Sequence, residues 1–302
     1  MTTTLDSTTT ADAAAAAELA RRHARREEDL RTPHGWLSLV GYHWLPSDPG
    51  ALPGVPGLWW ADADGAHHRP GATDGATDGP AVGPADGEAD GAVVDADGSP
   101  AGTVVVDEGG SHVVGTFLPA GREDAAADDE AGTVRVAVEV VRRTGRYAVR
   151  LRDPLAPART GFTGVPRYVH DPAWVLDAPV RWYDEARAVV VGAARPGLVH
   201  AVRAVGEVDV EHDGRTATLV LTGRPGGATT LLFSDEADDV APWRVLWVDV
   251  PDGPAAAPET LRLDLNGAVN LPYAFSAFGT CPAPVPGNHL PFAVAAGERA
   301  PR

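Results

Sequence analysis

The chain has 302 residues, of which 44% are hydrophobic and 22% charged, and its formal net charge is −17. This length suffices for two modest domains, or one large one, with a buried core. The acidity argues against nucleic acid and anionic membranes as partners, because binding to either needs a concentrated basic face. A single cysteine, Cys281, cannot form an internal disulfide, and no apolar run approaches the ~20 residues that span a bilayer. We therefore expect a soluble, cytoplasmic protein.

The N-terminal part of the sequence predicts one helix. Residues 1–10 are rich in threonine and typical of a disordered start. Ala, Leu, Arg and Glu favour a helix from Asp12 to Arg31, and the sequence RTPHG ends it. Residues 1–34 are accordingly interpreted as a disordered start followed by an N-terminal helix.

The next part of the sequence combines an apolar block with an acidic tract. Residues 33–50 hold a short, almost wholly apolar block bounded by turn residues, which predicts burial. The pair WW at 59–60 suits either an aromatic ligand platform or the filling of a core. Residues 61–101 are dense in Asp-Gly pairs, and we interpret them as an acidic, flexible insertion.

Val-rich or alternating segments separated by Gly and acidic turns dominate the remainder, and strands without intervening helices indicate antiparallel sheets. The fold prediction is all-β, with two antiparallel sandwich-like or barrel-like parts. The first covers residues 35–160, including the insertion, and the second covers residues 161–302. The expected strands are residues 102–108, 111–118, 133–141, 146–152, 187–193, 198–212, 215–223, 229–233, 243–250 and 260–266.

The stretch LDLNGAVNLPYAFSAFGTCPAPVPGNHLPFAV, residues 263–294, holds every asparagine of the chain and its only cysteine. Five prolines lie in it from residue 272 onward, and proline cannot donate to a sheet ladder. Its aromatic and aliphatic side chains nevertheless call for burial. We therefore expect residues 271–302 to form an ordered, irregular C-terminal strap that wraps over a sheet.

The amides of this stretch allow two interpretations. They can satisfy the buried main chain of an irregular segment, or they can line a pocket that the strap covers. The second leads to the hypothesis that the protein binds a small organic ligand or anion in a cleft beneath the strap. The expected ligand-binding residues are Arg244, Asp264, Asn266, Asn270 and Asn288. No cofactor and no metal site are expected, since the histidines show no metal-binding spacing.

The strap sequence resembles the C-terminal signature of the family catalogued as domain of unknown function 1684. GWLSLVGYHWL near the N-terminus and RLRDPLAPAR in the middle are similar to two further segments of that family. The resemblance implies a two-part β fold whose first half is similar to a forkhead-associated-type sandwich, and it implies no established reaction. Tyr273 stands where the family usually has a second cysteine. The segment FSDEADDVAPWRVLW is shorter than the equivalent segment of that family. Within it, Phe233, Asp235 and Arg244 correspond to residues of the family segment.

Two alternative functions stay open at this point. One is a hydrolase that uses Asp264 as a base or Cys281 as a nucleophile, although no G-x-S-x-G motif is present. The other is a protein-interaction scaffold that presents the acidic tract of residues 61–101. The sequence decides neither whether the protein is an enzyme nor its oligomeric state.

Overall fold

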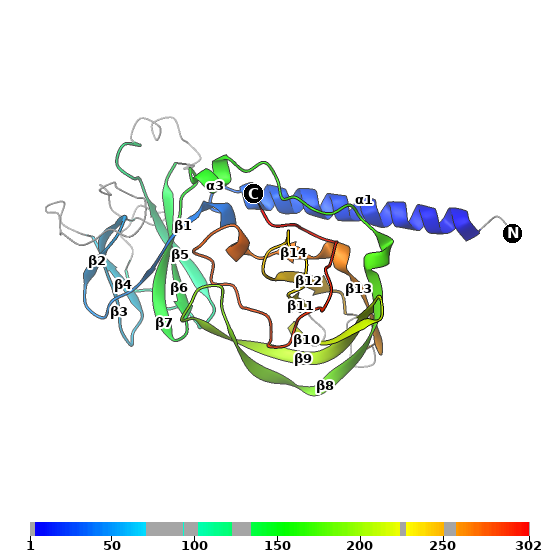
Figure 1. Cartoon of the computed structure of the whole chain (residues 1–302). Helices are drawn as coiled ribbons and strands as arrows, with labels where there is room; N and C mark the ends of the chain where they lie inside the picture. The colour runs from blue at the N-terminus through cyan, green and yellow to red at the C-terminus, as the bar shows by residue number, and fades with distance from the viewer. Residues whose placement is uncertain are drawn as a thin grey trace. The chain divides into compact units, whose positions relative to one another are not determined.

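The computed structural model describes residues 4–70, 93, 102–122, 134–223, 228–250 and 258–301. The described chain is mostly β, as predicted, and all of its strand pairs within sheets are antiparallel (Figure 1). The chain divides into two compact units. One is Leu30–Phe162, and the other joins Met1–Asp29 to Thr163–Arg302.

The described residues of the unit Leu30–Phe162 form one four-stranded and one three-stranded sheet, together with two short helices. Alternate residues of its strands meet in one hydrophobic cluster. In sheet order, the four strands are β1 (Leu39–Trp44), β7 (Arg146–Arg152), β6 (Val136–Arg143) and β5 (Ser111–Phe117). The other elements are β2 (Gly50–Leu52), β3 (Val55–Ala61), β4 (Ala66–Arg69), η1 (Trp36–Ser38) and α3 (Pro157–Thr160).

The two adjacent tryptophans have different surroundings in this unit. Trp59 is 1% exposed, belongs to the hydrophobic cluster and packs on His68 with ring centroids 4.3 Å apart. Trp60 stacks on His67 at 5.0 Å. Trp59 therefore fills the core, which is the second of the two roles that the sequence allowed.

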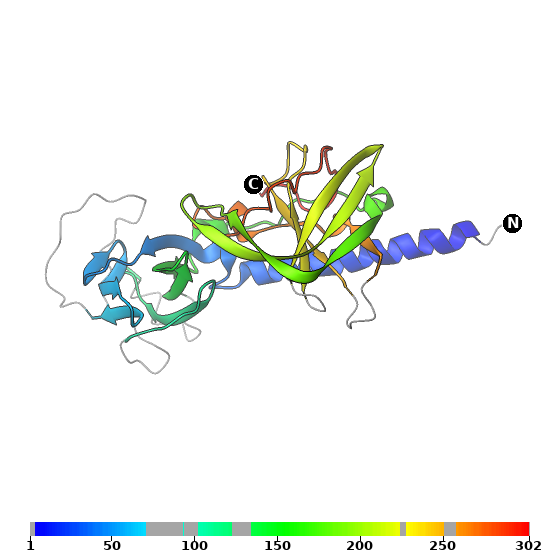
Figure 2. The ribbon, with the colours of Figure 1, turned by 90° about the horizontal axis from the view of Figure 1, so that it is seen from below.

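Helix α1 (Thr4–Arg31) begins before the expected start at Asp12. Once the Ala-rich turn is formed, each added residue gains a hydrogen bond, so the helix extends backward into the Thr-rich segment. Its residues up to Asp29 belong to the C-terminal unit, and Figures 1 and 2 show the helix alongside that unit.

The C-terminal unit is built on a seven-stranded sheet with ends at β13 and β14. The barrel-like closure that formed part of the fold prediction is not found among the described residues. Figure 2 shows β8 and β9 as long strands that curve across the unit. In sheet order, the strands are β13 (Thr260–Asp264), β8 (Val175–Gly192), β9 (Val199–His212), β10 (Arg215–Gly223), β11 (Thr229–Phe233), β12 (Arg244–Val248) and β14 (Val269–Asn270). The part of this unit that the structure describes also has three short helices, η2 (Pro172–Trp174), η3 (Leu265–Gly267) and η4 (Pro272–Ala274).

The turn between β9 and β10 follows directly from the sequence. Asp213 and Gly214 have φ angles of 49° and 72°, which is the left-handed conformation that a two-residue hairpin requires at both positions. Gly accepts this conformation without cost, and Asp tolerates it better than most residues. The Asp-Gly pair thus fixes the register in which β9 and β10 run antiparallel.

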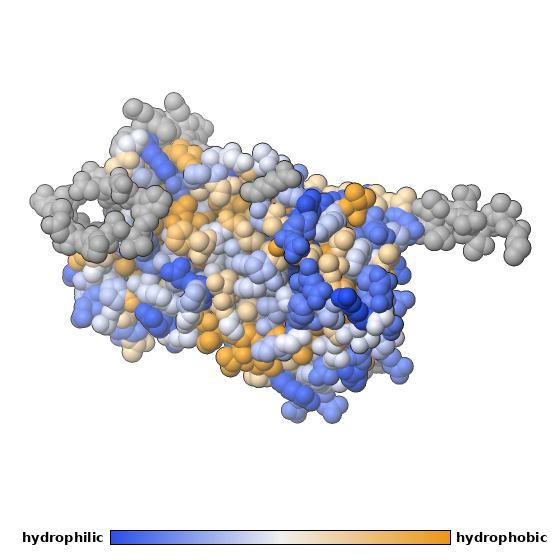
Figure 3. Space-filling model, in the orientation of Figure 1, coloured by the Kyte–Doolittle hydropathy of each residue, from blue (hydrophilic) through white to orange (hydrophobic). Residues whose placement is uncertain are grey.

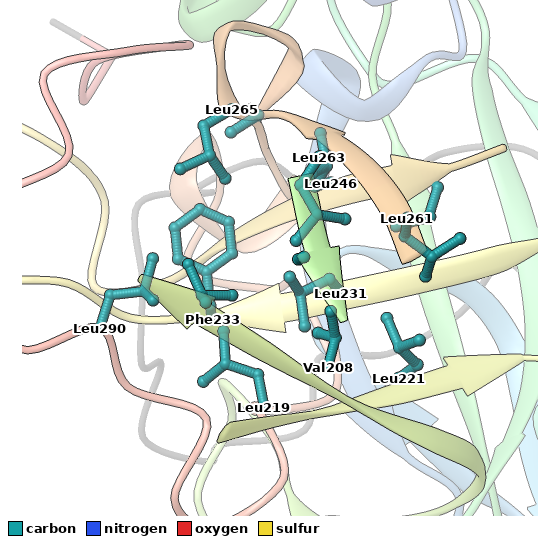
Figure 4. Packing of buried hydrophobic residues seen from close by; sticks show 14 of the residues in the cluster. Val208, Leu219, Leu221, Leu231, Phe233, Leu246, Leu261, Leu263, Leu265 and Leu290 are labelled. Carbon is teal, nitrogen blue, oxygen red and sulfur yellow. The ribbon is translucent and has the colours of Figure 1, made fainter. Parts of the chain in front are cut away.

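The core of the C-terminal unit lies on the concave side of the sheet, where leucines of β10, β11, β12 and β13 point toward one another (Figure 4). The strap completes this core with Leu290, Phe292, Val294 and Ala296, which are all 6% exposed or less. Their alternation with exposed residues is the burial pattern of a strand. Each large side chain buried in this way contributes about 1.5–3 kcal/mol. The strap is therefore an integral layer of the core.

Among the residues that the structure describes, no helix has the length and apolar character needed to cross a membrane.

Candidate functional site

Arg244 lies in the interior of the C-terminal unit and is 0% exposed. Its Nη2 donates to Asp235 Oδ2 at 2.7 Å and to the carbonyl oxygen of Val294 at 3.2 Å. Its Nη1 donates to the carbonyl oxygens of Ala296 and Glu298. The guanidinium thus binds alternate carbonyls of the strap, in the place where a neighbouring strand would supply N–H groups. It holds the strap against β12.

Asp264 and Asn266 form a separate local cluster at the end of β13. Asp264 Oδ1 accepts the main-chain N–H of Asn266 at 3.1 Å and its side-chain Nδ2 at 2.8 Å, which caps η3. The amide of Asn266 also pairs with both main-chain groups of Asp171, at 3.0 and 2.9 Å. This cluster fixes the entry to β8.

Asn270 is 1% exposed and pairs directly with Arg244 across β12 and β14. Its main-chain N–H donates to the carboxylate of Glu298 at 2.7 Å, and its Nδ2 donates to the carbonyl of Arg299. Glu298 is 2% exposed and also accepts Arg26 Nε at 2.6 Å from helix α1. The end of the strap is therefore tied to both β14 and α1.

Asn288 occupies the point where β10 and β11 separate. The two strands pair at Thr222 and Thr230 but not beyond. The Asn288 side chain accepts the N–H of Val220 at 2.8 Å and donates to the carbonyls of Val220 and Leu232, each at 2.9 Å. A single amide thus acts as a peptide group between the two strands.

The five expected ligand-binding residues consequently fall into three places. Arg244 and Asn270 lie together, Asp264 and Asn266 form the η3 cap, and Asn288 bridges β10 and β11. Their bonds to main-chain groups match the first interpretation of the amides. A role for them in ligand binding stays a prediction.

A pocket of about 560 Å³ does lie between the sheet and the strap. Its floor comes from β9, β10 and β11 and its other side from the strap, and its surface is mainly apolar. Of the five expected residues, Asn288 lines it. The lining residues are Val202, Arg203, Thr222, Gly223, Ala228, Thr230, Leu232, Pro282, Ala283, Val285 and Asn288.

The strap over this pocket is fixed by main-chain hydrogen bonds on both sides. Ala194 N–H donates to the carbonyl of Cys281, and Ala283 N–H donates to the carbonyl of Gly192, each at 2.9 Å. At the other side, the N–H of Ser234 donates to the main-chain carbonyl of Asn288. The roof is therefore held in place without a ligand.

Tyr273 has a structural role. Its hydroxyl donates to the carbonyl of Trp243 at 2.7 Å and accepts the N–H of the same residue at 2.8 Å. The two rings stack with centroids 4.2 Å apart. Burial raises the pKa of the Tyr273 hydroxyl above its usual range, so the group stays protonated and keeps both bonds.

The two residues predicted for a hydrolase, Asp264 as a base and Cys281 as a nucleophile, both take part in structural contacts. Cys281 is half-buried, and its carbonyl takes part in the strap contact described above. Asp264 uses its carboxylate as a helix cap. On the surface, Ser234 Oγ and His289 Nδ1 lie 3.0 Å apart. No group of three or more His, Cys, Asp or Glu suited to a metal ion occurs among the described residues.

Residues 160–299 match the profile of the family described as "Protein of unknown function (DUF1684)". This part of the chain belongs to the DUF1684 family. The resemblance of the strap sequence is thereby confirmed. The DUF1684 segment contains the whole pocket, the Arg244 contacts and the strap to residue 299.

Five solved chains match, and one of them is similar in part as follows. It is the solution NMR structure of an uncharacterised protein of Haloarcula marismortui, with 23% sequence identity and a TM-score of 0.38. The match covers 47% of this chain and 78% of that chain. Comparison with curated proteins gives no match.

Proposed function

We propose that the protein binds a small, mainly apolar organic molecule in the pocket between β9, β10, β11 and the strap. The observation that carries this proposal is the pocket itself, with its volume of about 560 Å³ and its mainly apolar surface. Small-molecule sites in proteins are typically preformed, mostly apolar hollows of roughly 300–1,000 Å³. The pocket falls inside that range.

The fixed roof supports the same proposal. Because the strap is pinned at Cys281, Ala283 and Asn288, the pocket keeps its shape without a ligand. A preformed site avoids the entropy loss of ordering a loop on binding. The bonds of Asn288 then serve binding indirectly, by holding β10 and β11 apart beneath the roof.

The alternatives have less support. The carboxylate of Asp264 caps η3, so its use as a hydrolytic base would compete with that structural role. The scaffold hypothesis concerns residues 61–101, of which 71–92 and 94–101 lie outside the described residues. A hydrolase would still be detected as turnover of ester or amide substrates by the purified protein.

The test uses a neutral, environment-sensitive dye, N-phenyl-1-naphthylamine, whose fluorescence rises in apolar surroundings. Val202→Trp places a large ring in the pocket at a half-exposed position of β9, so the variant is expected to fold. We expect the wild-type protein to bind the dye and Val202→Trp to bind it at least tenfold more weakly.

The matched control is Val190→Trp, the same change on the neighbouring strand β8. Val190 is 67% exposed and lies outside the pocket lining. Figure 3 shows that hydrophobic residues gather on the surface over β8 and β9. The Val190→Trp variant should bind the dye as the wild type does. Equal binding by Val202→Trp and the wild type, or no binding by either, would overturn the proposal.

A further inference from the structure

A row of directly opposed residues crosses the outer face of the seven-stranded sheet. The register places Arg187 opposite Ala204, Ala204 opposite Thr222, and Thr222 opposite Thr230. Thr230 in turn lies opposite Trp247. Directly opposed residues project from the same face, with Cβ atoms roughly 5 Å apart. The floor of the pocket therefore continues from Thr230 to Trp247.

Trp247 is unusually accessible for its type, with 65% of its surface exposed. Its neighbours along β12, Leu246 and Val248, point into the core at 4% and 6% exposure. The indole thus stands on the outer face of β12, beside the pocket wall that Thr230 forms. A flat or linear apolar group that leaves the pocket across β11 would meet this ring.

The hydroxyl groups of the pocket floor are paired with each other. Thr222 Oγ1 and Thr230 Oγ1 lie 3.0 Å apart, and Thr230 Oγ1 also donates to the carbonyl of Thr222 at 3.3 Å. Asn288 uses its amide on Val220 and Leu232, as described above. A ligand with many hydrogen-bonding groups would find few partners on this floor and would lose its contacts with water.

The charged residue of the lining does not favour an anion either. Arg203 follows Val202 on β9 in unbroken register with Ala188 and Val189. Successive side chains of a strand project to opposite faces. Val202 shares the face of Ala204 and Thr222, so the side chain of Arg203 leaves β9 on the face opposite to the pocket floor. The net charge of −17 further disfavours an anionic ligand.

We propose that the ligand is an elongated, uncharged apolar molecule that fills the pocket across β10 and β11 and packs its outer end on the indole of Trp247. This inference rests on the proposed function and specifies its ligand class. Long-chain alcohols and similar neutral molecules satisfy the description. Fatty acids and alkyl amines of the same length are the charged comparison.

The experiment measures displacement of N-phenyl-1-naphthylamine by dodecanol, dodecanoate and dodecylamine. We expect dodecanol to compete at least tenfold better than either charged compound. Trp247→Ala should weaken dodecanol roughly fivefold, because the aromatic contact is lost, and Trp247→Phe should stay within about twofold of the wild type. Trp36→Phe, an exposed tryptophan of the other unit, is the control and should have no effect.

A second readout locates the ligand. 12-Bromododecanol should quench part of the tryptophan fluorescence of the wild type, and that part should disappear in Trp247→Phe. One outcome would separate the two proposals. Dodecanol would bind the wild type and Val202→Trp would block it, but the Trp247 variants would bind dodecanol normally and keep the full quenching by 12-bromododecanol. In that case this inference is wrong while the proposed function stands. Tighter binding of dodecanoate than of dodecanol would also overturn it. Failure of the dye and every probe to bind would overturn both proposals.

Discussion

Arg244 and Asp235 form a buried ion pair, with 2.7 Å between Nη2 and Oδ2 and side chains that are 0% and 2% exposed. Each partner also binds the strap. The guanidinium takes the carbonyls of Val294, Ala296 and Glu298, and the second carboxylate oxygen accepts the N–H of Val294 at 3.1 Å. A charged pair thus substitutes for the strand that would otherwise bind this segment.

Removing one partner of this pair should strongly destabilise the fold. In Arg244→Met the carboxylate of Asp235 stays buried without its counter-charge, and three strap carbonyls lose a donor. We expect the free energy of unfolding to fall by about 3–5 kcal/mol. Urea denaturation followed by circular dichroism measures it. Arg262→Met, at an exposed position of β13, should change stability by less than about 0.5 kcal/mol.

Asn288 should be a structural residue first. Asn288→Ala removes three hydrogen bonds and leaves main-chain groups of Val220 and Leu232 without that partner. Unsatisfied buried groups cost about 1–3 kcal/mol each, so a loss of about 2–4 kcal/mol is expected. The pocket should lose its shape as well, which weakens dye binding in the folded variant.

Two further substitutions make this prediction specific to the amide. Asn288→Asp replaces the donor that faces two carbonyls by an acceptor, and it should be at least as destabilising as alanine. Asn266→Ala, at a half-buried site, should cost only about 1 kcal/mol. If Asn288→Ala unfolds at the same urea concentration as Asn266→Ala, the bridging role is wrong.

The pairing of Arg26 with Glu298 makes helix α1 part of the C-terminal unit. Arg26→Ala leaves the carboxylate of Glu298 buried with fewer partners and also frees the carbonyl of Asn270. Because Arg26 is 28% exposed, water reaches the site and reduces the loss to about 2 kcal/mol. Thermal unfolding of the full chain measures this loss.

The matched control is Arg22→Ala on the same helix. Arg22 pairs with Glu18 at 3.1 Å, but both side chains are largely in solvent. Exposed pairs of this kind contribute little to stability, so the unfolding midpoint should not move. Equal midpoints for the Arg26 and Arg22 variants would show that the helix is not held through Glu298.

Much of the sheet could be predicted from alternation and turn residues. The predicted strands 215–223 and 229–233 coincide with β10 and β11, because each alternates and ends at a glycine or polar turn. The first half of β8 was missed. Pro179 lies within it at an edge position paired with Thr260, and its sequence has the irregular, Pro-rich character of a crossover.

The site was less predictable than the fold. A strap that lacks N–H donors at its prolines needs polar side chains as partners, so the clustered amides could be singled out from composition. Arg244 was singled out through the segment that resembles the family. The pocket residues could not be singled out in either way. Val202 and Val285 are ordinary core-like valines in the sequence, and their meeting depends on where the strap crosses the sheet, which no local pattern encodes.

The hydrogen bond between Tyr168 and Asp239 predicts how stability changes at high pH. Burial, followed by the bond to Asp239, raises the pKa of the Tyr168 hydroxyl from 10.0 to about 12. A group whose pKa is raised on folding stabilises the protein, and this stabilisation is complete at pH values below the pKa of the group in the unfolded state. That contribution is lost as the pH rises from about 10 through about 12.

The same bond acts in the opposite direction at low pH. The hydrogen bond from Tyr168 is the main cause that lowers the pKa of Asp239 below 3.8, and Arg299 at 2.6 Å adds to it. A carboxylate whose pKa is lowered on folding stabilises the fold fully at pH values above its pKa in the unfolded state. This stabilisation is lost as the pH falls through its pKa in the folded state. Tyr168→Phe should therefore differ most from the wild type between about pH 4 and pH 10. The difference in urea midpoint should shrink on both sides, and a constant difference from pH 3 to pH 11 would show that the bond does not form.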